Sequence, residues 1–188
     1  MNTPSSRFFL SRIESPMGGM LLVTDARRIV RALDFADHEA HLHRGLREHY
    51  GSVELTEAPA PAGIAQALAR YFAGALDALD ALPTETAGSP LQRRVWAALR
   101  GIPAGTTTSY GKLARELGFD DPRAAIAIGA ANGANPIALI VPCHRVIASS
   151  GDLKGYAWRL PRKRWLLEHE KAILPQSAAA ETAALPGF

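Results

Sequence analysis

Ile140-Val141-Pro142-Cys143-His144-Arg145-Val146-Ile147 contains the only cysteine of this 188-residue chain. Short β-branched runs flank the thiol, and such runs are typical of buried strands. Pro142 lacks a backbone N–H and fixes φ, so we expect the chain to turn just before Cys143. A lone cysteine forms neither an internal disulfide nor a zinc site built from several cysteines. Cys143 is therefore either a small core residue or a nucleophile.

The two residues that follow the cysteine favour the nucleophile. His144 and Arg145 are costly to bury without partners, which makes them poor choices for filling a core. Neighbouring side chains of an extended strand point to opposite sides of it. His144 can therefore act as a base for the sulfur only through a turn or a bridging water. On these residues alone, a structural cysteine stays open as the alternative.

The composition indicates a globular protein. The chain is 47% hydrophobic, which is enough to bury the core of one large domain or of two small ones. No apolar run approaches the ~20 residues of a membrane span, and the first residues lack the pattern of a signal peptide. We therefore expect no membrane partner, and a thiol that is kept reduced fits the cytoplasm.

Positive charge is concentrated in the second half of the chain. Residues 1–90 carry 8 Lys/Arg and 11 Asp/Glu, a net −3, whereas residues 91–170 carry 12 and 6, a net +6. Such an asymmetry is the electrostatic footprint of a protein that binds a polyanion. A solvated basic surface would have the same composition and stays open as the alternative.

The pattern of apolar residues predicts an α+β fold. Residues 7–35 have the alternation and the turn signals of a small antiparallel sheet. Residues 37–49 and 61–79 have the helical spacing of amphipathic helices. From Ser89 onward helix signals dominate, and Pro161 starts the last of these helices.

A helix-turn-helix is predicted in the second half. Ser89-Pro90 caps the first helix there, and Thr108 or Ser109 caps the next one. Asp121-Pro122 combines an N-cap with proline at the first helical position and opens a helix over residues 123–132. Two helices joined by a short turn that contains Gly118 have the pattern of a helix-turn-helix.

These elements divide the chain into two expected domains and a tail. Residues 81–89, with proline and glycine, mark the linker. We expect residues 1–85 to form a supporting α/β domain and residues 89–175 to form a mainly helical domain that carries Cys143. Residues 176–188 are rich in alanine and are expected to be a soft tail.

The histidines of the first predicted helix do not have the spacing of a metal site. His38-Glu39-Ala40-His41 is one residue shorter than the spacing of zinc-dependent peptidases, and few acids lie nearby. We therefore expect a solvated helix face, which also includes His43, and no bound metal.

Several motifs resemble those of the O6-alkylguanine-DNA alkyltransferases. Pro142-Cys143-His144-Arg145-Val146 closely resembles the acceptor motif of that family, and the likeness extends over about half of the chain, from Pro90 to Glu170. It includes Ser109-Tyr110, Asn132-Gly133-Ala134-Asn135-Pro136, Gly155-Tyr156, Arg162-Lys163, Leu166-Leu167 and Glu170. Several motifs in the family's order make the resemblance specific.

The resemblance implies roles for five residues in alkyl transfer. Cys143 accepts the alkyl group as a stable thioether, so that each molecule acts once and uses no cofactor. His144 activates Cys143 through a water molecule, and Glu170 holds His144 as the third group of a triad. Tyr110 donates a proton to the departing guanine and helps to rotate the nucleotide out of the duplex. Asn135 braces the turn that carries Cys143.

The resemblance also implies a guanine pocket beside the acceptor. Tyr156, together with the loop residues Gly155, Ala157 and Trp158, is expected to wall it, because aromatic and backbone groups read a flipped base. Lys163 matches a family lysine near this site. Trp158 stands where many members have glycine, and we expect its indole to narrow the pocket.

The second helix of the helix-turn-helix is the expected DNA-binding element. Its small side chains let the backbone lie close to a minor groove, although tight helix packing would use them equally. The expected DNA-binding residues are Arg123, Ala124, Ala125, Ile126, Ala127 and Arg145. The family usually has arginine where this chain has Ile126, so we expect weaker DNA binding with alkyl transfer retained.

The expected function is direct reversal of alkylation damage in double-stranded DNA that bears O6-alkylguanine, by a protein that is monomeric off DNA. Alkylated thymine stays open as a second substrate. One alternative is a lesion-binding protein without transfer, but such proteins replace the acceptor cysteine that this chain keeps. The other is a cysteine hydrolase, which would explain the thiol but not the helix-turn-helix or the basic second half.

Overall fold

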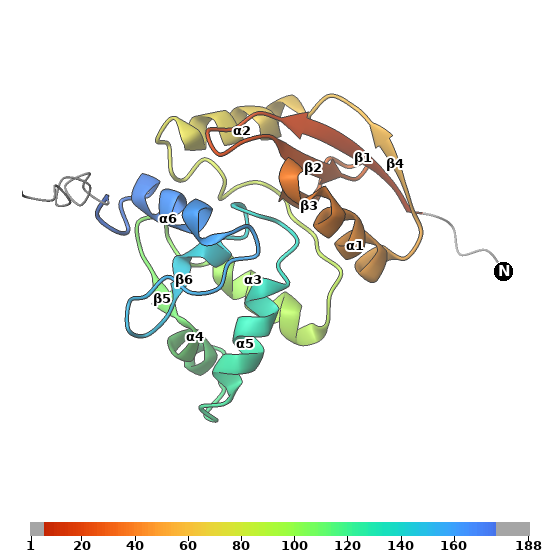
Figure 1. Ribbon diagram of the computed structural model, residues 1–188. Coiled ribbons are helices and arrows are strands. Elements are labelled where there is room, and N and C mark those ends of the chain that lie inside the picture. The colour runs from red at the N-terminus through yellow and green to blue at the C-terminus, as the bar shows by residue number, and fades with distance from the viewer. Residues whose placement is uncertain (1–5, 176–188) are drawn as a thin grey trace, which may run out of the picture.

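A computed structural model describes residues 6–175 and shows a small sheet with helices that lies against a mainly helical half (Figure 1). The predicted α+β fold is confirmed. The strands are Ser6–Ile13 (β1), Met20–Thr24 (β2), Val30–Phe35 (β3), Val53–Glu57 (β4), Thr108–Ser109 (β5) and Val146–Ile147 (β6). The helices are Glu39–Tyr50 (α1), Ala62–Phe72 (α2), Pro90–Arg100 (α3), Tyr110–Glu116 (α4), Ala124–Gly133 (α5) and Leu160–His169 (α6), with short 3-10 turns at Ala36–His38 (η1) and Cys143–Arg145 (η2).

The sheet has a strand that the sequence did not reveal. Its order is β3-β2-β1-β4, and β4 pairs parallel to β1, from Ser6 with Val53 to Leu10 with Glu57. The antiparallel pairing expected within residues 7–35 is confirmed, and β4 adds a parallel edge strand to that sheet. β4 was missed because this edge strand, Val-Glu-Leu-Thr-Glu, is mostly exposed and has only two apolar side chains to mark it.

Strand β2 is buried on both faces, and this joins the two halves of the molecule. Leu21 and Val23 pack in one apolar cluster with Leu42 and Leu46 of α1. The alternate residues of β2 point to the opposite face, because side chains alternate along a strand. On that face a second cluster contains Met20 and Leu22 of β2, Ile64 and Leu68 of α2, and Val95, Leu113 and Leu166 of the helical half.

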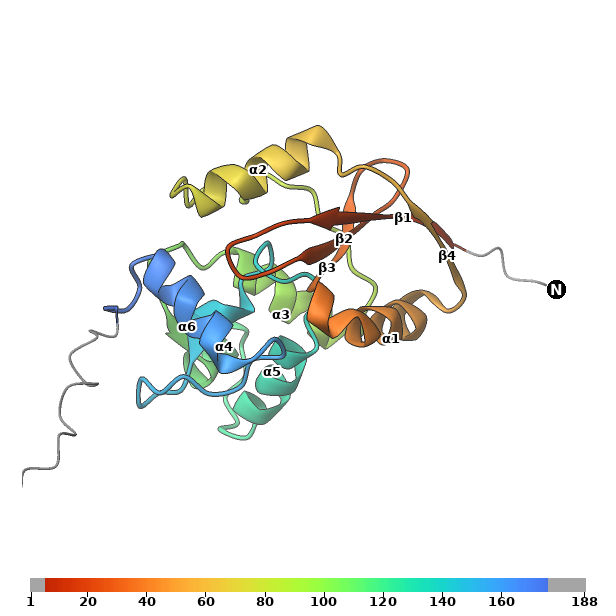
Figure 2. The same cartoon turned by 45° about the horizontal axis from the view of Figure 1, so that its top comes forward.

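Because this second cluster is shared, the sheet and the helical half have a common core. Figure 2 shows the helical half lying alongside the sheet. The division into domains 1–85 and 89–175 stays a prediction. The tail 176–188 lies outside the described residues. No helix within residues 6–175 combines the length and the apolar character that crossing a membrane would need.

The outer edge of β3 is covered by two segments that come later in the chain. Val30 N–H donates to Pro83 O at 2.9 Å, and Glu85 N–H donates to Val30 O at 3.1 Å. Further along, Leu33 N–H donates to Pro136 O at 3.0 Å, and Ala138 N–H donates to Leu33 O at 2.8 Å. The expected linker is thus fixed along β3, and so is the segment that leads to Cys143.

Several predicted helices have different bounds in the structure. The helix expected over residues 37–49 begins at Glu39, after a 3-10 turn, and ends at Tyr50. The helix expected over residues 61–79 ends at Phe72, because Gly74 has φ +103° and the chain continues in turns. The helix expected from Arg123 starts at Ala124, and Asp121 caps the preceding turn by accepting from Arg123 N–H at 2.9 Å.

The other helix signals were correct. Ser89 and Gln92 form a capping box at α3, and Ser109 caps α4 by accepting from Lys112 N–H at 3.2 Å. α4 and α5 are joined by a turn that contains Gly118, as predicted.

Candidate active site

Cys143 begins the 3-10 turn η2, which leads directly into β6. The residue is buried, with 2% of its surface exposed. The turn follows Pro142 as expected, and it avoids the strand geometry in which His144 and Cys143 would point to opposite sides. The chain therefore turns at the point where a turn is needed for His144 to act as a base for the sulfur.

Asn135 holds the segment that precedes the cysteine. Its Nδ2 donates to Val141 O at 2.8 Å and to Ile137 O at 3.2 Å, while its Oδ1 accepts from Ile137 N–H at 3.0 Å. Asn132, at the end of α5, donates to Cys143 O at 3.4 Å. Both amides are buried, so the position of the sulfur is fixed by side chains as well as by the backbone.

The Glu170 carboxylate binds four donor groups at the C-terminus of α6. Oε1 accepts from His144 Nε2 at 2.9 Å, from Arg145 Nη2 at 2.8 Å and from the Tyr71 hydroxyl at 2.7 Å. Oε2 accepts from Arg145 Nε at 2.9 Å. The side chains of His144 and Glu170 are fully buried, so the fold brings together the histidine and carboxylate that the sequence predicted.

The electrostatics of this cluster make His144 a neutral base. Burial by itself would raise the pKa of Glu170, but the hydrogen bonds and charges of His144 and Arg145 hold that pKa far below its usual range. Burial lowers the pKa of His144, which Glu170 opposes only in part. With its Nε2–H directed to the carboxylate, His144 has a free lone pair on Nδ1, and this buried atom contacts no partner within residues 6–175.

The Cys143 thiol is protonated at neutral pH. Burial raises its pKa to about 11, although Asn135 and the positive charge of Lys163 oppose the shift. A thiol is a much weaker nucleophile than a thiolate. Any reaction at Cys143 therefore requires a base at the moment of attack, and the Nδ1 of His144 is the chemically suitable group.

Tyr110 lies between α5 and the loop that follows β6. Its hydroxyl donates to Lys154 O at 3.3 Å. A Cβ at Gly155 would lie 3.7 Å from the Tyr110 hydroxyl oxygen. A Cβ on Gly129 of α5 would be 3.7 Å from the ring. Burial raises the pKa of Tyr110, and the negative charge of Cys143 raises it further once the thiol ionises, so the Tyr110 hydroxyl stays available as a proton donor.

Lys163 connects the loop that follows β6 to β6 itself by hydrogen bonds. Its Nζ donates to Val146 O at 2.6 Å, to Lys154 O at 3.1 Å and to Gly155 O at 3.2 Å. The side chain is fully buried, and burial lowers its pKa to about 8. Lys163 is thus a structural brace of the loop, close enough to affect Cys143 by its charge.

Trp158 does not occupy the position expected from the sequence. Its indole is fully buried and donates to Asp34 Oδ1 of β3 at 2.5 Å. The ring lies behind Tyr156, at a centroid distance of 5.2 Å, while Gly155 and Ala157 are exposed. The expectation that the indole narrows the pocket is therefore wrong, because its hydrogen bond directs it to the sheet.

Arg145 was also assigned wrongly, to the DNA-binding surface. It is 5% exposed and its guanidinium is used by Glu170 and by Ile102 O. Tyr71 was missed in the sequence, because a tyrosine on the apolar face of α2 has the pattern of a core residue. Only the fold shows that its hydroxyl reaches Glu170.

The expected DNA-binding helix presents its N-terminal end to solvent. α4 and α5 lie at the end of the molecule farthest from the sheet (Figure 1). The Arg123 side chain is 89% exposed and Ile126 is 76% exposed. Ala127 is exposed, whereas Ala124 and Ala125 are half-buried. An exposed isoleucine on a helix of small residues is available for contact with a partner.

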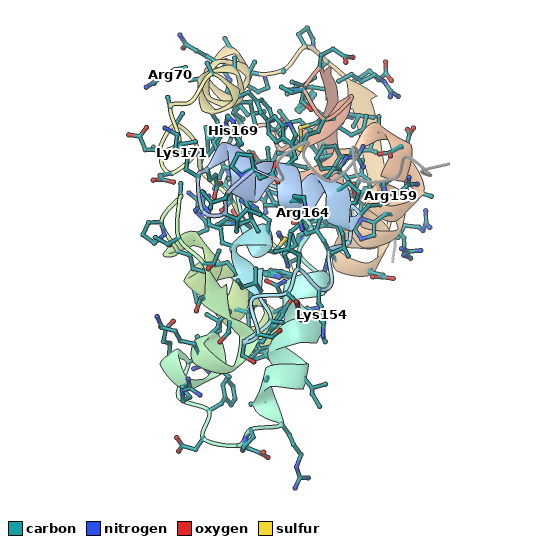
Figure 3. All side chains as sticks on the ribbon, turned by 60° about the vertical axis from the view of Figure 1, so that its left-hand side comes forward. Arg70, Lys154, Arg159, Arg164, His169 and Lys171 are labelled. Atoms are coloured by element: carbon teal, nitrogen blue, oxygen red, sulfur yellow. The ribbon has the colours of Figure 1, made fainter. Side chains whose placement is uncertain are left out.

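Several basic side chains lie on the face that carries α6. Figure 3 shows this face with Arg70, Lys154, Arg159, Arg164 and Lys171, and with His169. Of the three cations in the first turn of α6, Lys163 is buried, and Arg162 packs over the Phe35 ring at 4.0 Å. Only Arg164 of these three is substantially exposed, and it lies 3.7 Å from Glu168.

Comparison with known proteins identifies close relatives. Residues 90–172 match the family model described as 6-O-methylguanine DNA methyltransferase, DNA binding domain. The chain is 45% identical to the methylated-DNA–protein-cysteine methyltransferase of Salmonella typhimurium, over 89% of this chain and 98% of that protein.

Two solved structures from Mycobacterium tuberculosis are similar to this chain in fold. The fold is similar to that of its O6-methylguanine methyltransferase, with a TM-score of 0.69, 37% identity, and coverage of 92% of this chain and 98% of that one. The same organism's OGT in complex with DNA matches with a TM-score of 0.72 and 39% identity, covering 87% of this chain and 93% of that one.

We predict that Tyr71→Phe lowers the free energy of unfolding by about 1.5–3 kcal/mol, the usual contribution of a hydrogen bond to a charged group. The substitution removes one donor to the buried Glu170 carboxylate. Urea unfolding measures the loss. Tyr50→Phe is the matched control, since the hydrogen bonds of the Tyr50 hydroxyl with Glu85 O and Ala87 N are long, at 3.4 Å. Equal losses in the two variants would contradict the prediction.

We predict that alkylation of Cys143 by iodoacetamide accelerates about tenfold per pH unit from neutral pH to about pH 10, because only the thiolate reacts. The rate increases with pH because the pKa of Cys143 is raised to about 11, and the thiolate fraction grows with pH below that value. Mass spectrometry reports the rate without ambiguity, since the chain has one cysteine. Free cysteine, as the control, should level off above its pKa of about 8.5. If the rate for the protein also levelled off at about pH 8.5, the raised pKa of Cys143 would be refuted.

Proposed function

The chain belongs to the family of methylated-DNA–protein-cysteine methyltransferases, and we propose that it repairs O6-alkylguanine in duplex DNA by transferring the alkyl group irreversibly to Cys143. The observation that carries this proposal is the buried chain of contacts from Glu170 to His144, placed next to the single cysteine. The names of the relatives and the DNA complex of a similar structure support it.

In the proposed reaction, the Nδ1 of His144 takes the proton of the Cys143 thiol through a water molecule. The sulfur attacks the alkyl carbon, so that a C–S bond forms while the bond between that carbon and O6 breaks. The electron pair of the broken bond stays on guanine, which accepts a proton from Tyr110. His144 and Tyr110 exchange their gained and lost protons with solvent, and the net result is a thioether and an unmodified guanine.

A neutral His144 is essential to this scheme, and the cluster supplies it. Glu170 accepts the Nε2–H and fixes the ring, while burial keeps the imidazole unprotonated. When the histidine becomes positively charged in the reaction, the adjacent carboxylate stabilises that charge. Arg145 neutralises Glu170 in the resting state, which makes the burial of its carboxylate possible.

Access to the sulfur requires a local opening, because Cys143 is 2% exposed. The contact of 3.3 Å between the Tyr110 hydroxyl and Lys154 O closes one side of the site. A flipped guanine would separate Tyr110 from the loop and bring its alkyl group between Tyr110 and Tyr156. Tyr110 would then be placed to donate its proton to the base.

DNA would be bound by α5 and the basic second half of the chain. Arg123 just before α5 and Ile126 in its first turn are exposed where a minor groove can approach the alanine-rich backbone. Ile126 takes the place of the wedge that enters the base stack. We place the activity in the cytoplasm, where the unpaired thiol stays reduced.

Mass spectrometry of the intact protein tests the proposed function directly. After incubation with duplex DNA that contains O6-methylguanine, we expect one methyl group per protein molecule, on the peptide that contains Cys143. Cys143→Ala should gain none. DNA binding without a mass change would indicate a lesion-binding protein. Release of more product than protein would indicate a hydrolase, and either outcome would reject the proposal.

We predict that Ile126→Arg binds methylated duplex about three- to tenfold more tightly than the natural protein at low salt, because it adds one cation at the DNA surface. Fluorescence anisotropy at fixed ionic strength measures the dissociation constant. Ile126→Gln is the control, since it is of similar length and uncharged. Equal affinities of the natural protein and Ile126→Arg would count against a weakened wedge at this position.

A further inference from the structure

We propose that Asp34, in strand β3 of the sheet, is a positioning residue for alkyl transfer. It acts through Trp158, whose indole it binds, and thereby fixes the loop that walls the guanine site. This inference rests on the proposed function. It assigns a role in the reaction to a residue of the first half of the chain, far from the acceptor motif.

The first observation is the set of contacts around the Asp34 carboxylate. Oδ1 accepts from Trp158 Nε1 at 2.5 Å and from Phe35 N–H at 2.7 Å, and Oδ2 lies 2.7 Å from His41 Nδ1. Asp34 is 1% exposed and Trp158 is not exposed at all. A buried carboxylate with three polar contacts fixes the direction of the indole, which apolar packing alone would leave less well defined.

The second observation is the way in which the loop is held at both ends. At one end, Lys163 binds Lys154 O and Gly155 O. At the other end, Trp158 is anchored by Asp34. Tyr156 lies between these two anchors, and its ring packs on that of Trp158 at a centroid distance of 5.2 Å. The anchor at Asp34 therefore determines where the Tyr156 ring stands.

The Tyr156 hydroxyl gives a further reason to connect the anchor with ligand binding. This oxygen is buried and has no hydrogen-bond partner within residues 6–175. Unsatisfied buried hydroxyls are rare, and one in a proposed base site is available for a substrate. Its direction depends on the ring that Trp158 supports, so a displaced indole would misplace the hydroxyl.

The third observation is that β3 also holds the acceptor segment. Leu33, next to Asp34, exchanges backbone hydrogen bonds with Pro136 and Ala138, at 3.0 and 2.8 Å. These residues flank Ile137, to which Asn135 binds, and they lead to Cys143. One strand therefore supports both the segment before the nucleophile and the loop opposite it. A rigid common support is what keeps two reacting groups in register.

The test uses single-turnover methyl transfer from duplex DNA with O6-methylguanine at saturating DNA, together with the dissociation constant of the same duplex. Trp158→Phe keeps an aromatic ring but loses the N–H, and Asp34→Leu loses the acceptor. We expect both variants to transfer about tenfold more slowly, because small displacements of reacting groups have effects of this size or larger. The dissociation constant should change less than about twofold, since neither residue lies on the DNA-binding helix.

Asp34→Asn is the rescue variant, because its side-chain oxygen can still accept from the indole, and it should transfer within about threefold of the natural protein. Trp165→Phe, a matched substitution on α6 away from the loop, should leave the rate unchanged. Rates are normalised to the folded fraction, obtained from thermal unfolding. If Asp34→Leu does not fold, Trp158→Phe decides the outcome alone.

The inference is overturned if Trp158→Phe transfers at the natural rate, or if Asp34→Asn is as slow as Asp34→Leu. The first result would show that the indole hydrogen bond has no effect on the reaction, and the second that it is not what Asp34 supplies. These results are distinct from a failure of the proposed function, in which the natural protein itself would transfer no methyl group.

Discussion

The site depends on one buried carboxylate. Glu170 accepts four hydrogen bonds, from a histidine, an arginine and a tyrosine, and these donors compensate the burial of its charge. Two of these partners, His144 and Arg145, come from the acceptor turn, and Tyr71 comes from α2. The cluster therefore needs both halves of the chain, and burial within it lowers the pKa of the proposed base.

Strand β3 holds backbone segments together, as Glu170 holds side chains together. One edge pairs with β2, while the other receives the segment around Pro83 and the segment around Pro136. The first half of the chain is thus more than the support that its sequence indicated. It carries Tyr71 to Glu170 and Asp34 to Trp158, so the parts of the site contributed by the acceptor motif are held from outside that motif.

The sequence could predict the features that are encoded locally. The caps at Ser89 and Ser109 and the turn at Cys143 follow from a few neighbouring residues. The motif resemblance also placed His144 and Glu170 together, which the structure confirms. Arg145 and Trp158 were misplaced because their positions depend on partners far away in the sequence, Glu170 and Asp34, and a pattern of neighbours contains no information on such pairs.

Strand β4 has a consequence for self-association. Because the outer edge of β3 is occupied, β4 is the edge at which the sheet, as far as residues 6–175 show it, stays open to another strand. Free edges invite pairing between molecules, and charged side chains oppose it. Glu54 and Glu57 are exposed on this five-residue strand, and Arg7 lies 3.6 Å from Glu54. The polar side chains of β4, because of which the strand was not predicted from the sequence, thus oppose aggregation of the folded protein through its sheet.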